Sequence, residues 1–230
     1  KAAYEARGKK YAAARLAMLE AESEGLSALR EANAVRVPTP AASGVASDVA
    51  FLALEWLDFD RGGRDATLGR AFAVLHRTTG PRFGWHRDNT IGTTPQDNTW
   101  SDDWTTFYRD RRILPQFALA ARNGHRGSFE RDGDRLLAAI PTLLAGHAPS
   151  PSLLHGDLWS GNWGRLDDGT PVIFDPAVSC SDAEADIAMM DLFGAPPAGF
   201  WPAYREAAGL HDGYLRRAGL YRLYHLLNHA

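Results

Sequence analysis

The sequence predicts an α+β protein with two lobes, a small αβ N-terminal lobe over residues 1–58 and a larger, mainly helical lobe over residues 59–230. Two observations lead to this prediction. Helical periodicity and short apolar strand-like runs alternate only in the first quarter of the chain, and helical patterns dominate afterwards. A length of 230 residues also suits a two-lobed protein. We expect the N-terminal lobe to be truncated or to lack residues, because the chain begins at Lys1.

The elements of the N-terminal lobe follow from periodicity and from turn residues. Residues 12–32 predict an amphipathic helix, with leucines recurring on an approximate 3.6-residue period. Pro38 and Pro40 end this helix, and the Ala/Ser/Gly segment 41–48 predicts a turn. The apolar run at 51–57 then predicts a buried strand.

The larger lobe begins with a linker and a second helix. Residues 60–63 are rich in charge and glycine and predict the linker, and residues 65–79 predict a helix that ends near His76. Helices are expected from there to the C-terminus, interrupted by one loop and one short strand between 151 and 176.

Composition limits the classes of partner. Apolar residues make up 45% and charged residues 23% of the chain, as in an ordinary globular protein with a sizeable core. A net charge of −3 gives no basic surface for nucleic acid or an anionic membrane, and no apolar run approaches the ~20 residues that span a bilayer. The single cysteine, Cys180, excludes an internal disulfide and predicts a reducing, cytoplasmic location.

The segment 151–176, PSLLHGDLWSGNWGRLDDGTPVIFDP, carries the chemistry. It places His155-Gly156-Asp157 five residues before Asn162, and a short apolar strand then delivers Asp175. An acid, an amide and a second acid at this spacing fit phosphoryl transfer: the first carboxylate orients or deprotonates a hydroxyl, and the other two groups hold Mg²⁺ on nucleotide phosphates. Asp and Asn beside Gly are also common turn residues, but their joint occurrence with a strand-terminal Asp favours the kinase-like interpretation.

The residues within and around this motif resemble a known family. LLHGDLWSGNW is similar to the hallmark of the fructosamine kinase (ketosamine-3-kinase) family, whereas aminoglycoside phosphotransferases and choline kinases share only the HGDxxxxN skeleton. Further similar segments follow in family order: FGWHRDNTIG (83–92), WSDDWTTFYRDRRILPQ (100–116), EADIAMMDLFG (184–194) and LYRLYHLLNH (220–229). The resemblance implies a two-lobed protein-kinase-like fold, with ATP and Mg²⁺ bound between the lobes.

For the base, the metal ligands and the acceptor pocket, five residues have expected roles. Asp157 is the expected catalytic base toward a sugar hydroxyl, and Asn162 and Asp175 are the expected metal ligands. Trp159 is a candidate for an apolar wall of the sugar pocket, with packing of the loop as an equal alternative. His155 is expected to brace the loop rather than to transfer protons.

For the nucleotide half, the resemblance implies that the main chain of Glu55 and Leu57 contacts adenine and that Glu22 is the helix glutamate of the family. A solvated helix face is the alternative for Glu22. The family strand that ends in Phe-Val-Lys is not matched, because Ala12-Ala13-Ala14 follow a strand-like start at 8–11. We expect the missing lysine to lie in residues that this sequence lacks, and we assign no phosphate-binding lysine.

Several further residues have structural or open roles. Trp163 is expected to pack, and the loop 83–89 to line the acceptor pocket. The segment 101–103 is as well suited to cap the helix predicted at 104–113 as to hold an amine. Glu184 and Asp186 are expected to serve as caps or in salt bridges.

The sequence thus predicts an ATP-dependent kinase of the sugar moiety of ketosamines, a deglycation enzyme acting on a small ketosamine or a glycated protein. Two alternatives stay open: a small-molecule kinase of the aminoglycoside or choline type, and a catalytically weak nucleotide-binding pseudokinase, favoured by the unmatched lysine. The sugar of the acceptor and the oligomeric state are left undetermined.

Overall fold

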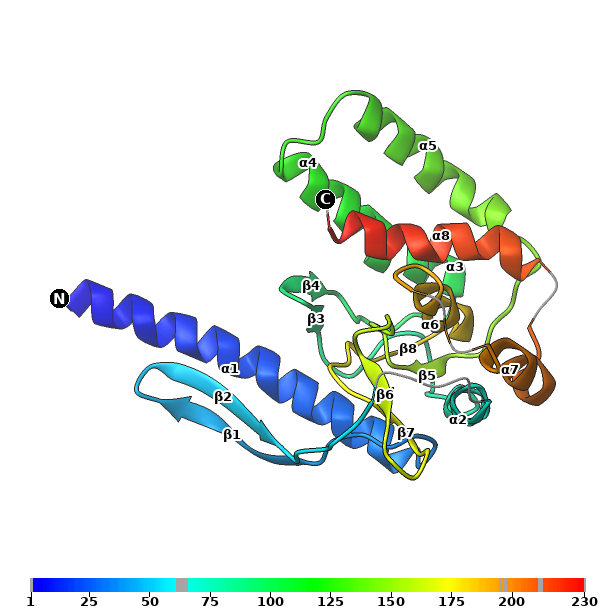
Figure 1. The fold of residues 1–230 in the computed structure, drawn as a ribbon. Coiled ribbons are helices and arrows are strands. Elements are labelled where there is room, and N and C mark those ends of the chain that lie inside the picture. Colours follow the sequence, from blue (N-terminus) through cyan, green and yellow to red (C-terminus); the bar gives the residue numbers. More distant parts are fainter. Residues whose placement is uncertain (1, 61–65, 195, 197, 211–212, 230) are drawn as a thin grey trace.

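The computed structural model of the chain describes residues 2–60, 66–194, 196, 198–210 and 213–229, with side chains from Tyr11 onward. A long helix and a β-hairpin form a small part that projects from a larger, mostly helical body (Figure 1). The predicted α+β architecture is therefore confirmed. No helix in these ranges is both long and apolar enough to cross a membrane.

The helices are α1 (Ala2–Glu31), α2 (Thr67–Leu75), α3 (Trp104–Phe107), the π-helical segment η1 (Tyr108–Ile113), α4 (Leu114–Arg122), α5 (Ser128–Leu143), α6 (Ala183–Met190), α7 (Phe200–Ala208) and α8 (Tyr214–Leu227). The strands are β1 (Pro40–Ala46), β2 (Val49–Leu54), β3 (Asn89–Ile91), β4 (Thr94–Gln96), β5 (Ser152–Leu154), β6 (Trp163–Arg165), β7 (Pro171–Ile173) and β8 (Ser179–Ser181). Over the described residues they pair as four antiparallel two-stranded sheets, β1–β2, β3–β4, β5–β8 and β6–β7.

Helix α1 is longer than predicted. It includes residues 8–11, where the sequence predicted the start of a strand, so that prediction is wrong. The alanine-rich sequence that follows favours continuous helix. Leu26 and Leu29 are fully buried, whereas Leu16 and Leu19 are only half-buried, because the N-terminal part of α1 extends away from the body (Figure 1).

The β1–β2 hairpin corrects two further predictions. Residues 41–48, predicted as a turn, are mostly strand, and only Ser47 and Asp48 turn the chain, both with positive φ (47° and 65°) as a two-residue hairpin turn requires. The strand predicted as buried over 51–57 alternates between exposed and half-buried residues, and Phe51 is 41% exposed. One face of the hairpin packs on α1, and the opposite face carries the exposed side chains.

The connection into the larger body agrees with the sequence where it is described. Asp60 forms an isolated bridge with Arg165 of β6, and the rest of the predicted linker, 61–63, lies outside the described residues. The helix predicted over 65–79 is α2, with His76 as its C-cap, so its predicted end is confirmed.

The helix predicted at 104–113 is divided between α3 and η1. Its predicted cap is confirmed, because the side chain of Asp103 accepts a hydrogen bond from the N–H of Thr106 at 2.6 Å. Asp102 instead forms a two-pronged ion pair with Arg82. These carboxylates are therefore used structurally.

Helices α2 and α7 pack closely at a glycine. A Cβ added at Gly69 would lie 2.5 Å from the carbonyl oxygen of Phe200 and 3.1 Å from the nitrogen of Tyr204. Backbone atoms of a helix cannot move aside without shifting the whole helix. The small size of this residue therefore sets the distance between α2 and α7.

We predict that Gly69→Ala lowers the free energy of unfolding by about 1–3 kcal/mol, because the added methyl group overpacks this contact. The matched control is Gly219→Ala in α8, where nothing lies within 4 Å of the added Cβ. There the alanine should gain up to about 1 kcal/mol through helix propensity. Urea unfolding of both variants measures the difference, and equal shifts of the same sign would contradict the assigned contact.

Candidate active site

The loop that follows β5 is shaped by a glycine. Gly156 has φ of 86°, and a Cβ at this position would lie 2.0 Å from the carbonyl oxygen of Ala177. The main chain of the loop therefore lies directly against the segment after Asp175, and only glycine fits there. This contact brings the two halves of the motif, Asp157 and Asp175, to the same place.

A buried carboxylate on α6 holds the loop from beneath. Asp186 accepts hydrogen bonds from the main-chain N–H groups of His155 (2.7 Å) and Gly156 (2.8 Å). Burial alone raises the pKa of Asp186, but the hydrogen bond and charge of His76, aided by His155 and the N–H of Gly156, bring that pKa below its usual range. The carboxylate stays ionised and accepts both bonds.

His155 braces the loop through both ring nitrogens. Nε2 donates to the carbonyl oxygen of Phe174 at 2.9 Å, and Nδ1 accepts from the N–H of Asp157 at 3.2 Å. The ring is fully buried, and burial lowers the pKa of His155, which favours the neutral form that these two bonds require. These contacts are structural, in line with the bracing role predicted for this residue.

Asn162 links Asp157 to the main chain of Asp175. Its Nδ2 lies 2.9 Å from the carbonyl oxygen of Asp157, 3.3 Å from Asp157 Oδ2 and 3.4 Å from the carbonyl oxygen of Asp175. Asp175, just after β7, adopts a left-handed conformation with φ of 59°. The amide nitrogen is occupied by these bonds, which leaves Oδ1 as the atom that Asn162 can offer to a cation.

Three carboxylates line one cavity of about 80 Å³, those of Glu22, Asp157 and Asp175, with Asn89 beside them. Burial and then the charge of Asp175 raise the pKa of both Asp157 and Glu22 to about 7. Like charges this close disfavour one another, and a bound cation would relieve the repulsion. Carboxylate and amide oxygens are the ligands that Mg²⁺ prefers, so the residues present fit this ion.

Glu22 reaches the cavity because α1 packs tightly one turn further on. A Cβ at Gly25 would lie 3.1 Å from Val178 Cγ2, just after the loop of Asp175. Glu24 adds contacts to the segment 83–89, accepting from His86 at 3.0 Å and Arg87 at 2.7 Å. No lysine follows residue 10 in the sequence, and the side chains before Tyr11 are not described.

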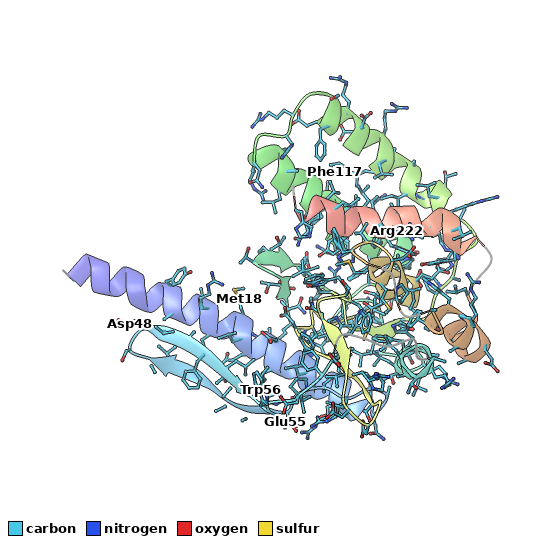
Figure 2. All side chains as sticks on the ribbon, viewed as in Figure 1. Met18, Asp48, Glu55, Trp56, Phe117 and Arg222 are labelled. Carbon is cyan, nitrogen blue, oxygen red and sulfur yellow. The ribbon has the colours of Figure 1, made fainter. Side chains whose placement is uncertain are left out.

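The two residues expected to contact adenine, Glu55 and Leu57, lie apart from this cavity. Glu55 follows β2 at the end of the hairpin that joins the larger body (Figure 2), where its carboxylate pairs with Arg36 and accepts from the N–H of Thr39. Its own N–H donates to the carbonyl oxygen of Thr39 at 2.9 Å. Leu57 is half-buried, and neither residue lines the carboxylate cavity.

Trp159 lies on the other side of Asp157. The indole is 39% exposed and folds over Gly161, and together with Asp157 it lines a second cavity of about 300 Å³. Trp163 is only 8% exposed and belongs to the core, as predicted for a packing residue. The structure therefore brings together the predicted residues Glu22, Asp157, Asn162, Asp175 and Trp159. Glu55 and Leu57 line neither of the two cavities.

The sequence did not single out Asn89 or His225, which line these cavities. Asn89 was covered only as part of the loop 83–89, yet its amide donates to the carbonyl oxygen of Val178 at 2.8 Å and lines the carboxylate cavity. His225 lines the second cavity from α8. Its only sequence signal was its place inside the segment 220–229.

Comparison with solved structures first defines the fold to which this chain belongs. A structure of a choline/ethanolamine kinase family protein from Mesorhizobium loti superposes with a TM-score of 0.56 at 14% identity, over 93% of this chain and 68% of the other. This likeness shows the fold alone. The predicted protein-kinase-like fold is confirmed.

The chain belongs to the fructosamine kinase family, whose model matches residues 9–230. A Synechocystis protein named "Probable ketoamine kinase" is 44% identical over 92% of this chain and 72% of its own length. The chloroplastic protein-ribulosamine 3-kinase of Arabidopsis thaliana is 39% identical over 93% of this chain and 66% of its own. A structure named "Putative fructosamine-3-kinase" from Haemophilus somnus superposes with a TM-score of 0.85 at 31% identity, over 92% of this chain and 72% of the other.

We predict that Asp157→Asn stabilises the protein without metal at pH 8. A carboxyl with a pKa of about 7 in the folded state and about 4 when unfolded costs stability as pH rises from 4 to 7, and the amide carries no such cost. The melting temperature of the variant should exceed that of the wild type by several degrees (~3–8 °C) at pH 8 and match it near pH 4. A lower melting temperature at pH 8 would contradict the assigned repulsion.

Proposed function

We propose that this protein transfers the γ-phosphoryl group of ATP, with Mg²⁺, to a hydroxyl of the sugar moiety of ketosamines. The observation that carries the proposal is that Asp157 and Asp175 line one cavity and Asn162 bonds to both, in a chain of the fructosamine kinase family. The named activities of the relatives, ketoamine kinase and protein-ribulosamine 3-kinase, point to the same acceptor class.

In this mechanism Asp157 accepts a hydrogen bond from the acceptor hydroxyl and takes its proton as the phosphoryl group transfers. A carboxyl whose pKa is raised to about 7 by burial and by Asp175 is suited to hold that proton near neutral pH. Asp175 and Asn162 would hold Mg²⁺, which when bound neutralises charge on the phosphates. Asp186 and His155 keep the loop in the geometry that this proton transfer needs.

For the nucleotide, the main chain of Glu55 and Leu57 remains our candidate for adenine recognition. Because the N–H of Glu55 bonds to Thr39, its carbonyl and the main chain of Leu57 are the groups that would contact the base. Glu22, beside Asp175, would act on the phosphate and metal side of the nucleotide. With the lobes divided between residues 58 and 59, as predicted from the sequence, the nucleotide would lie between them.

For the acceptor, we propose a fructosamine or ribulosamine phosphorylated at the 3-hydroxyl, either as a small adduct or on a glycated protein. Phosphorylation there destabilises the sugar–amine adduct, so the reaction reverses early glycation. Trp159 beside the catalytic aspartate supplies an apolar surface for the sugar ring. A cytoplasmic location stays a prediction from the single, buried cysteine.

We predict ADP release in a coupled assay when the wild-type protein receives ATP, Mg²⁺ and fructosyl-lysine or ribulosyl-lysine. Asp157→Asn should lower kcat by about 10²–10⁴-fold, the usual contribution of a positioned base. The matched control is Asp168→Asn, in an exposed loop of the same segment, whose kcat should stay within twofold of wild type. Turnover of choline or an aminoglycoside, with none of either ketosamine, would contradict the proposal.

A further inference from the structure

The cavity beside Asp157 has the character of a sugar site. It has a volume of about 300 Å³, at the lower end of the range of roughly 300–1,000 Å³ typical of small-molecule sites. Trp159, Met189 and Phe193 form an apolar part of its wall, and Asp157 and His225 supply polar groups. The C–H faces of a sugar suit such a wall, and its hydroxyls need hydrogen-bonding partners.

The imidazole of His225 is buried, and no hydrogen bond joins it to another described residue. The side chain is 4% exposed, its Nδ1 has no hydrogen-bond partner, and no hydrogen bond joins Nε2 to another described residue. Other enclosed histidines of the described chain are bonded: His76 to the hydroxyl of Tyr204 at 2.8 Å, and His147 to Asp182 at 2.6 Å. Burying an unpaired polar group costs stability, so such a group calls for a functional explanation.

The position of His225 is fixed by its neighbours on α8. The ring of Tyr224 packs edge-on against it with centroids 5.2 Å apart, and the Tyr224 hydroxyl donates to Gln96 at 2.7 Å. One turn earlier, the hydroxyl of Tyr221 bonds to Asp182 at the start of α6. The imidazole is therefore held in place before any ligand arrives.

We propose that the imidazole of His225 forms a hydrogen bond to a hydroxyl of the ketosamine sugar and so helps to determine acceptor specificity. The inference rests on the proposed function and deepens it by naming a recognition group on the acceptor side. It explains why α8 places a histidine, and not an apolar residue, in this part of the cavity wall.

The protonation state supports this role. The pKa of His225 is lowered to about 4, mainly by burial. The charge of Asp186 raises this pKa, and His229 lowers it slightly. The ring is neutral at physiological pH, with one N–H donor and one nitrogen acceptor. A sugar hydroxyl both donates and accepts, so it can bond to an imidazole nitrogen in either tautomer.

The test compares His225→Phe and His225→Gln with Tyr214→Phe, which removes a different buried and unpaired polar group outside this cavity. His225→Phe should raise KM for fructosyl-lysine about tenfold, the size of one neutral hydrogen bond, with KM for ATP within twofold of wild type. His225→Gln should recover most of the affinity, because its amide restores a donor and an acceptor. Tyr214→Phe should leave both KM values unchanged.

A second measurement does not depend on turnover. In the Asp157→Asn protein, the imidazole ¹⁵N resonances of His225 should shift when fructosyl-lysine is added, while those of His125 stay unchanged. An unshifted His225 resonance at saturating ligand, or an unchanged KM in an active His225→Phe protein, would overturn this inference alone. A wild-type protein that phosphorylates no ketosamine would defeat the proposed function instead.

Discussion

The carboxylate of Asp186 is the interaction on which the active-site geometry depends. It accepts the N–H groups of His155 and Gly156 and also faces Nε2 of His76 at 3.4 Å. It thus joins the catalytic loop to α6 and, through His76, to α2. Removing one partner of a buried charge lowers the free energy of unfolding by about 3–5 kcal/mol. The catalytic loop, α6 and α2 therefore depend on one another for stability. The placement of Asp157 is a consequence of this anchor.

Helix α6 is in turn held to α8 by a buried polar network. Arg217 makes a bidentate ion pair with Glu184 at 2.7 Å, and Asp182 caps α6 while accepting from Tyr221. Because α8 also carries His225, the same network that supports the catalytic loop fixes the far wall of the sugar cavity. The base and the proposed recognition group therefore belong to one rigid unit.

The sequence was most informative where a motif imposes its own geometry. Asp157, Asn162 and Asp175 were predicted together because their spacing reflects a loop and a strand, and the structure brings them together. The sequence was least informative about which face of an apolar strand is covered and which is exposed. The run at 51–57 was expected to be buried because it is apolar, yet its outward face lies beyond the reach of α1. Apolar composition cannot distinguish a covered face from an uncovered one.

The residues missed by sequence reasoning are those with long-range partners. His225 and Asp157 are far apart along the chain, and only the packing of α8 on α6 brings them to one cavity. The anchoring role of Asp186 was only partly foreseen as a cap or salt bridge, because acceptance of loop N–H groups leaves no local pattern. In contrast, the Asp103 cap is local, and the sequence offered it as an option.

Amide hydrogen exchange at His155 and Gly156, compared between the wild type and Asp186→Asn, tests most directly whether this carboxylate holds the catalytic loop. Asp191→Asn, which breaks a solvent-exposed ion pair with Arg222, is the matched control. We expect exchange at both amides to rise at least tenfold in Asp186→Asn, in parallel with a loss of kcat, and to stay unchanged in the control. Unchanged exchange and unchanged kcat in a folded Asp186→Asn protein would contradict this account.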